Sequence, residues 1–215
     1  MENEMKVYHV RNKIKVVGLI QDGLTFSHET MGEKFYVGML RVKRKSRVED
    51  VLPITIPGRL YEQARTICDK PIQIIGQIRT YNKIVDGFGR LFVTIHAYSI
   101  GESDEEAMNE VQLYGTIIKK PVYRTTPFGR EICDLMIAVN RSYGKSDYLP
   151  CIAWECIAEK ADTLNVGDRV EISGRIQSRD YEKKLDNGER IVRTAYEVSV
   201  FKLEMERENN NDRIY

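Results

Sequence analysis

The chain has 215 residues, of which 42% are hydrophobic and 30% charged, and its net charge is +1. This length allows two small domains with separate cores, and the composition is that of an ordinary globular protein rather than a disordered one. No apolar run approaches the roughly 20 residues of a membrane-spanning helix. The first five residues lack the basic and apolar regions of a signal peptide. We therefore expect a cytoplasmic protein.

Charge is distributed unevenly along the chain. Residues 1–100 hold 16 Lys and Arg against 10 Asp and Glu, a net +6, whereas residues 109–205 hold 15 of each. Residues 101–108 between them carry a net −4 and include Gly and Ser. Such an acidic run between two longer segments is typical of a linker. We call residues 1–100 module one and residues 109–205 module two.

The predicted elements of module one begin with a strand over 12–18. A turn at Gly32 leads to a second strand over 35–42, and the basic run 43–47 leads to a third, which passes directly into a helix near Leu60. A strand around 72–76, a hairpin turn at 86–89 and a last strand over 91–100 complete the module.

Module two repeats this order 97 residues later. Strands are predicted over 109–115, 132–139 and 148–154, then a helix from Glu155, then strands around 170–174 and over 191–203. The helix faces of both copies follow the i, i+4, i+7 spacing of an amphipathic helix. They are formed by Leu60, Ala64 and Ile67 in module one and by Ile157, Ala161 and Leu164 in module two. Gly18 and Gly115 occupy the first strands and suggest a sharp bend or bulge.

Three strands, a helix and two further strands form the order of the OB-fold, although other small barrels share parts of it. We predict a mainly β protein with two tandem OB-fold five-stranded Greek-key barrels, each with one short α-helix. The predicted domains are 1–100, a diverged and basic OB-fold; 101–108, an acidic linker; 109–205, the second OB-fold; and 206–215, a flexible tail.

The side chains that usually hold metals lack the spacing of a metal site. They are Cys68, Cys133, Cys151, Cys156, His9, His28 and His96. No CxxC pair, Ser/His/Asp pattern or phosphate-binding loop occurs. We predict reduced cysteines, no metal, no cofactor and no enzymatic activity.

Module two resembles the bacterial single-stranded DNA-binding protein (SSB) family over residues 109–203. The matching segments are 109–115, 123–129, 135–141, 148–154, 164–179 and Tyr181. Many spaced matches in one order are more specific than any single motif. Module one looks like a diverged copy of the same unit, recognised mainly through module two.

The resemblance implies that aromatic rings stack on unpaired bases and that basic side chains meet phosphates. The stacking positions fall on Tyr143, Tyr148, Trp154 and Tyr181, and the basic positions on Arg124, Arg141, Lys145, Arg175 and Arg179. Each stacked base stabilises the complex by about 1–3 kcal/mol with little regard to sequence. Phosphate contacts make the affinity salt-dependent. Each of these residues also has an alternative interpretation without DNA: a tyrosine in a strand can pack against its neighbours, and an arginine on the surface can simply be solvated.

Module one departs from this pattern. It has Ser46, Val51 and Pro57 where module two has Tyr143, Tyr148 and Trp154. Its weaker candidates for DNA contact are Lys43, Arg44, Lys45, Arg47 and Tyr81. A charge run of this kind is equally consistent with a solvated loop.

The resemblance implies sequence-nonspecific binding and protection of single-stranded DNA in replication, recombination or repair, by a nucleoid-associated protein. Some SSBs with two OB-folds per chain dimerise, which implies a homodimer through an OB module, with replication or repair proteins as possible partners. The end of this chain lacks the acidic, apolar tip that recruits such proteins in typical members. The alternative is a replication or conjugation accessory factor, similar to primosomal OB proteins, in which one module mainly binds protein.

Overall fold

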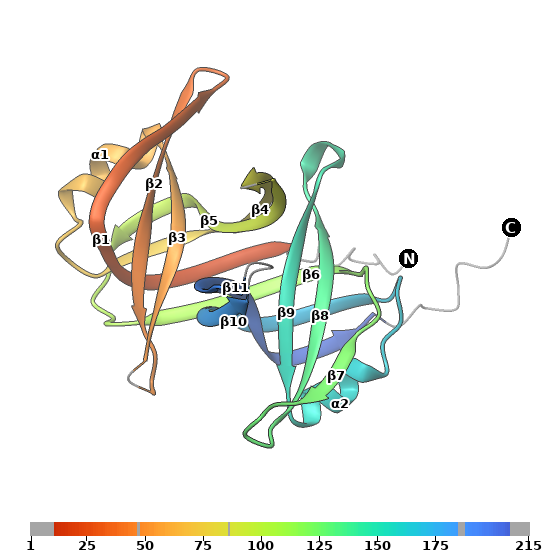
Figure 1. Ribbon diagram of the computed structural model, residues 1–215. Coiled ribbons are helices and arrows are strands. Elements are labelled where there is room, and N and C mark those ends of the chain that lie inside the picture. The colour runs from red at the N-terminus through yellow and green to blue at the C-terminus, as the bar shows by residue number, and fades with distance from the viewer. Residues whose placement is uncertain (1–10, 47, 86, 185–187, 207–215) are drawn as a thin grey trace, which may run out of the picture.

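Two barrels of strands lie side by side in the computed structural model, which describes residues 11–46, 48–85, 87–184 and 188–206 (Figure 1). Module one contains β1 (Asn12–Thr30), β2 (Glu33–Lys43), β3 (Glu49–Pro57), α1 (Gly58–Thr66), β4 (Ile72–Val85) and β5 (Phe88–Glu102). Module two contains β6 (Met108–Ile117), β7 (Val122–Thr125), β8 (Glu131–Asn140), the 3-10 turn η1 (Ser142–Gly144), β9 (Ser146–Trp154), α2 (Cys156–Asp162), β10 (Arg169–Lys184) and β11 (Arg190–Met205).

Each barrel closes in the same way. In module one, β1 pairs antiparallel with both β2 and β4, and β3 lies parallel to β5. In module two, β6 pairs with β8 and β10, and β9 lies parallel to β11. This connectivity confirms the predicted pair of five-stranded OB barrels. The short strand β7, which adds to β8, was not expected from the sequence.

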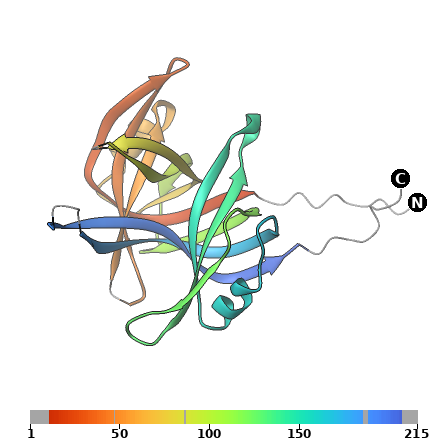
Figure 2. The same ribbon diagram turned by 45° about the vertical axis from the view of Figure 1, so that its right-hand side comes forward.

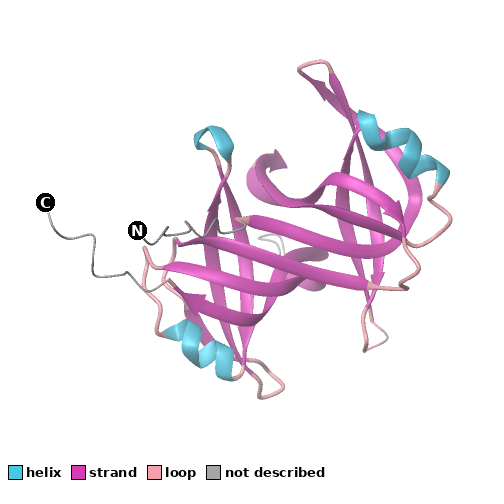
Figure 3. Ribbon diagram, turned by 180° about the vertical axis from the view of Figure 1, so that it is seen from behind, coloured by secondary structure: helices cyan, strands magenta, loops and turns pink. Residues whose placement is uncertain are grey.

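The helices bury the faces that their spacing predicts. Ala64 of α1 and Ala161 of α2 have no exposed surface, and Leu164, just after α2, is buried. Leu60 and Ile157 are partly buried and pack against the core. Each helix covers one end of its barrel, as the cyan ribbons show in Figure 3. The apolar side chains of the strands fill both barrels.

Gly18 and Gly115 mark the points where the first strand of each barrel changes partner. β1 pairs with β4 up to Gly18 and with β2 from Leu19, and β6 makes the corresponding change beyond Gly115. A Cβ at Gly18 would collide with the carbonyl oxygen of Arg41, and one at Gly115 with that of Ala138. The predicted bend is therefore a place where only glycine lets two strands approach closely enough.

The two barrels are joined through their first strands. β1 and β6 pair antiparallel, with Asn12 opposite Leu113 and Val16 opposite Asn109, so one sheet runs through both modules. Asn109 and Leu113 are the module-two counterparts of Asn12 and Val16, 97 residues later in the chain. A pseudo-twofold axis therefore passes through this strand pair. β5 ends at Glu102 and β6 begins at Met108, so only 103–107 connect the strands.

Two buried aspartates also hold the modules together. Asp50, which is fully buried, accepts hydrogen bonds from the guanidinium group of Arg44, which also donates to the Ser178 carbonyl oxygen at 3.1 Å. Asp50 further accepts from the Ser178 backbone N–H at 2.7 Å. We call this group the Asp50 clasp.

The Asp147 clasp repeats this arrangement in the opposite direction. Asp147 accepts from Arg141 Nε at 2.8 Å and from the Thr80 backbone N–H at 2.5 Å, and Arg141 donates to the Thr80 carbonyl oxygen at 2.7 Å. Arg79 Nη1 adds a contact to Asp147 at 3.0 Å. Each clasp thus satisfies backbone groups of the other module, which is why an aspartate is buried in each.

Candidate nucleic-acid interface

Tyr148 and Trp154 lie near the two ends of β9 and point to the outside of the barrel. Leu149, Cys151 and Ala153 alternate with them and are buried in the core, whereas Tyr148 is exposed and Trp154 is half-buried. At about 3.3 Å per residue, the two rings are roughly 20 Å apart. That separation spans several unpaired nucleotides.

The neighbouring strands add cations to the same outer surface. Ile152 of β9 lies opposite Ser199 of β11, and Ser199 lies opposite Arg175 of β10. Because side chains alternate, Arg179 and Tyr181 follow Arg175 on the same face of β10. The outer face of the sheet formed by β9, β11 and β10 therefore carries Tyr148, Trp154, Arg175, Arg179 and Tyr181.

Trp154 lies in a groove of about 450 Å³ together with Arg130, Arg175 and Phe201. The guanidinium carbon of Arg130 stands 4.5 Å from the centroid of the indole ring, a cation–π contact, and Arg130 Nε donates to Glu155 at 2.9 Å. Phe201 is exposed beside them. The groove offers two rings and several cations, the chemistry that binds unpaired bases and phosphates.

Arg175 is held in surroundings that already contain excess positive charge. Its guanidinium lies 3.7 Å from Asp50, which Arg44 engages more closely. Burial, and then the charge of Arg44, lower the pKa of Arg175 from its ordinary value, against the opposing effect of Asp50. A phosphate in this groove would relieve the repulsion between the two guanidinium groups.

Tyr181 lies in a second and larger groove, of about 900 Å³, between the modules. Arg179 stands 5.8 Å from the Tyr181 ring centroid and pairs with Glu197 at 3.4 Å. From module one the groove receives Tyr81, whose ring stacks on Phe92 with centroids 5.3 Å apart. Figure 2 shows the β10–β11 hairpin reaching toward module one, and residues of both modules line the groove.

Several predicted residues lie elsewhere. Arg124 pairs with Asp134 at 2.6 Å on the β7–β8 edge, and this hydrogen bond raises the pKa of Arg124. Arg141 and Arg44 hold the buried aspartates of the two clasps, so their guanidinium groups are already engaged between the modules. Lys145 is exposed just before β9. The Tyr143 side chain, and Arg47 as a whole, lie outside the described residues.

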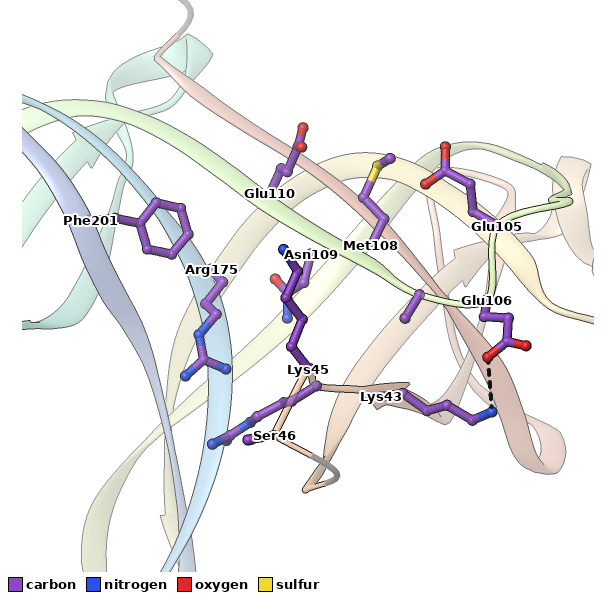
Figure 4. A pocket seen from close by; sticks show the side chains of 12 residues that line it. Lys43, Lys45, Ser46, Glu105, Glu106, Met108, Asn109, Glu110, Arg175 and Phe201 are labelled. Atoms are coloured by element: carbon purple, nitrogen blue, oxygen red, sulfur yellow. Dashed lines mark hydrogen bonds and ion pairs between the residues drawn. The ribbon is translucent and has the colours of Figure 1, made fainter.

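Residues 43–46 of the basic run line a third groove, of about 950 Å³ (Figure 4). Lys43 pairs with Glu106 at 3.5 Å, and Lys45 and Glu105 line the same space. The acidic connection between the modules thus pairs with Lys43, one of the lysines predicted to contact DNA.

Sequence reasoning missed Arg130, Phe201, Phe92 and Arg193 among the groove residues. Phe201 carried a detectable signal, since Val200 and Phe201 break the alternation of β11. The structure explains this break by a bulge, with Ser173 opposite Lys202 and Gly174 opposite Val200. No signal in the sequence pointed to Arg130, because only the pairing of β8 with β9 brings it to Trp154.

The described residues contain no helix of the length and apolarity that a bilayer crossing requires. Across the same ranges, no cluster of His, Cys, Asp or Glu side chains has the arrangement of a metal site. All four cysteines are free thiols.

Comparisons with known proteins identify the family. Residues 108–206 match the model of the "Single-strand binding protein family". The chain is 32% identical over 111 residues to "Single-stranded DNA-binding protein 2" of Listeria monocytogenes, covering 48% of this chain and 68% of that protein. It is 33% identical over 98 residues to "Single-stranded DNA-binding protein A" of Bacillus subtilis, covering 42% of this chain and 56% of that protein.

A solved structure covers both modules. The wild-type single-stranded DNA binding protein from Thermus aquaticus aligns with a TM-score of 0.73 at 22% identity, over 91% of this chain and 93% of that one. This likeness shows the shared two-barrel fold, while the family model matches module two. Together with the barrel geometry, the matches show that the chain belongs to the single-strand binding protein family.

Proposed function

We propose that this protein binds single-stranded DNA without regard to base sequence, and protects it during replication, recombination or repair. Relatives of this chain are named single-stranded DNA-binding proteins, and the family model matches module two. We further propose that it acts as a binding protein without catalytic activity. The primosomal-type alternative would leave one module mainly for protein contact.

The half-buried ring of Trp154 among cations carries this proposal. Every base has a π-face, so a ring held rigidly at the end of a strand binds any base with similar strength. Arg130 covers part of the indole and must share it with an incoming base or stack on that base itself. Arg175 and Arg179 then lie within the same groove to meet phosphates.

The proposed interface consists of the outer faces of β9, β10 and β11, together with Arg130 before β8 and Lys145 before β9. Its rings are Tyr148, Trp154, Tyr181 and Phe201, and its cations are Arg130, Lys145, Arg175 and Arg179. We leave Arg44 and Arg141 out, because moving either guanidinium to a phosphate would take from a fully buried aspartate its closest cationic partner. Tyr143 remains a candidate from the resemblance.

We also propose that the chain forms a homodimer through an OB module. Apolar side chains on the long hairpins support this, since Ile84, Phe88 and Val192 are largely exposed. Burying them against a second copy would remove apolar surface from water.

The experiment that tests DNA binding uses the single tryptophan of the chain. Titration with oligo-dT should quench Trp154 emission, because a stacked base quenches the indole directly. Trp154→Ala should weaken binding by roughly 1–3 kcal/mol, about 5- to 150-fold, while the protein stays folded. Log K for oligo-dT should also fall linearly with log salt, with a slope near −0.7 for each neutralised phosphate.

Val166→Ala provides the control, since it truncates an exposed apolar side chain in the turn after α2, outside the proposed interface. It should leave both quenching and affinity unchanged. The stacking role would be refuted if Trp154 emission did not change on addition of oligo-dT and if Trp154→Ala bound oligo-dT with wild-type affinity.

A further inference from the structure

Module one carries aromatic rings on its outer face, although its β3 lacks the rings found on β9. His28 of β1 stacks on Phe35 of β2 with centroids 5.0 Å apart and an interplanar angle of 18°. Phe35 lies 5.8 Å from His96 of β5, and His96 lies 5.8 Å from Tyr98, edge to face. We call these four residues the ring row.

The ring row lies beside the module-one position that corresponds to Trp154. Phe35 pairs with Pro57 across β2 and β3, just as Ile132 pairs with Trp154 across β8 and β9. Pro57 is the module-one counterpart of Trp154, 97 residues earlier. The aromatic surface at this end of the barrel has therefore moved from β3 to the flanking strands.

Tyr98 has a counterpart of its own in module two. β5 bulges between Ala97 and Ser99, as β11 bulges between Val200 and Lys202, so Tyr98 and Phe201 are the two bulged residues. Both rings are exposed, Tyr98 to 43% and Phe201 to 54%. Both barrels therefore carry an exposed aromatic ring at the bulge of their last strand.

The ring row is continuous with the groove between the modules. His96 lies opposite Thr55 of β3, and the Thr55 hydroxyl is 2.9 Å from that of Thr94, which lines the groove. Further along the same groove stand Tyr81 and, from module two, Tyr181. One outer face therefore leads from the ring row to the proposed interface of module two.

The arginines near the ring row are paired with carboxylates, Arg59 with Glu33 and Arg79 with Asp147. Arg79 Nη2 donates to the Tyr98 hydroxyl at 3.1 Å, which fixes that ring, and Arg79 also reaches the Asp147 clasp. Burial lowers the pKa of His96 first, and the charges of Arg79, Arg59 and Arg141 lower it further, with Glu33 opposing them. Exposed rings next to hydroxyl groups and paired charges suit unpaired bases better than an apolar protein surface.

We propose that module one binds a second segment of the same DNA single strand, through the ring row and the groove that joins it to Tyr181. The strand would then run from the β9 face of module two across the groove to Tyr98. This inference rests on the proposed function, and it adds a site in module one made from residues outside β3.

The test compares short and long oligo-dT on the full chain. An OB module accommodates about 4–16 nucleotides, so an oligomer of about 8 reports on one module and one of about 30 on both. The variant His28→Ala with Tyr98→Ala removes the two exposed ends of the ring row. It should leave Trp154 quenching by the short oligomer unchanged and weaken the long oligomer about 10-fold or more, since each lost stacked base costs about 5- to 150-fold.

Phe26→Ala is the matched control. Phe26 is an exposed ring on β1, but its partner is Tyr36, which stacks on Tyr61 of α1 in a separate cluster. Phe26→Ala should change neither the affinity for the short oligomer nor the affinity for the long one.

The proposal would be overturned if the His28→Ala, Tyr98→Ala variant bound the long oligomer as tightly as Phe26→Ala does, with an unchanged circular dichroism spectrum. Module one would then be a protein-docking unit. An equal loss for both oligomers would also overturn it, because the ring row would then not be a separate site. Failure of wild-type protein to bind the short oligomer would instead refute the proposed function itself.

Discussion

Replacing Asp147 with Ala should destabilise the whole chain by about 3 kcal/mol. The carboxylate is fully buried and accepts hydrogen bonds from Arg141, Arg79 and the Thr80 backbone. Its loss would leave the Thr80 N–H without its acceptor and two guanidinium groups without their counter-charge. No apolar side chain of similar shape would replace it.

The magnitude follows from how far the remaining partners can reach water. Removing one member of a buried ion pair costs about 3–5 kcal/mol, and an unsatisfied buried N–H about 1–3 kcal/mol. The side chains of Arg141 and Arg79 are each 25% exposed, so they can rehydrate, which favours the lower end. For a chain of this size, about 3 kcal/mol corresponds to a fall in melting temperature of roughly 6–12 °C.

Urea denaturation followed by circular dichroism measures this loss. Asp50→Ala should behave alike, since the Asp50 clasp offers Ser178 the same contacts. Asp134→Ala is the control, because its pair with Arg124 is about half exposed and such pairs contribute about 0–1 kcal/mol. A loss for Asp147→Ala no larger than that for Asp134→Ala would refute the reasoning that the clasps hold the modules together.

Two further predictions concern assembly and pH. Light scattering at micromolar concentration should give twice the 24.9 kDa chain mass, and a monomer would contradict the proposed dimer. The lowered pKa of His96 in the folded state means that the unfolded chain binds its proton first, so stability should fall as pH drops below about 6.5. His96→Gln should reduce this loss, as judged by urea midpoints at about pH 7.5 and pH 5.5. An identical pH dependence in both proteins would contradict the assignment to His96.

The order of elements was readable because it rests on local patterns. Alternation gave the strands, the spacing of Leu60 and Ala64 gave the helix face, and the repeat at 97 residues confirmed both by agreement between copies. Gly18 was recognised as unusual, but its reason is tertiary. Only the pairing of β1 with both β4 and β2 shows that a side chain there would strike the backbone of Arg41.

The clasps could not be inferred from charge alone. The sequence offers Arg44 and Asp50, and again Arg141 and Asp147, in polar connections where solvated side chains are the usual outcome. The repeated spacing of six residues was a signal of a shared role. Its meaning depends on which backbone each aspartate meets, and that is set by the contact between β3 and β10 and between β9 and β4.

The ring row was missed for a related reason. When β3 is compared with β9 position by position, Val51 and Pro57 stand where β9 has rings, so on this strand alone module one has lost its aromatic surface. Bases contact a surface, however, and a surface is formed by several strands. Phe35, His96 and Tyr98 come from two other strands and meet only when the barrel closes.

The two kinds of contact explain why the copies agree inside and differ outside. Between the modules, each aspartate must satisfy the same backbone groups of its neighbour, so Arg44, Asp50, Arg141 and Asp147 keep one spacing. On the outer faces a base needs only an exposed ring near a cation, and any strand can supply it. Symmetry is therefore demanded at the pseudo-twofold axis and not at the binding surface. For this reason we expect unequal contributions to DNA affinity from the two modules, with the larger one from the module that holds Trp154.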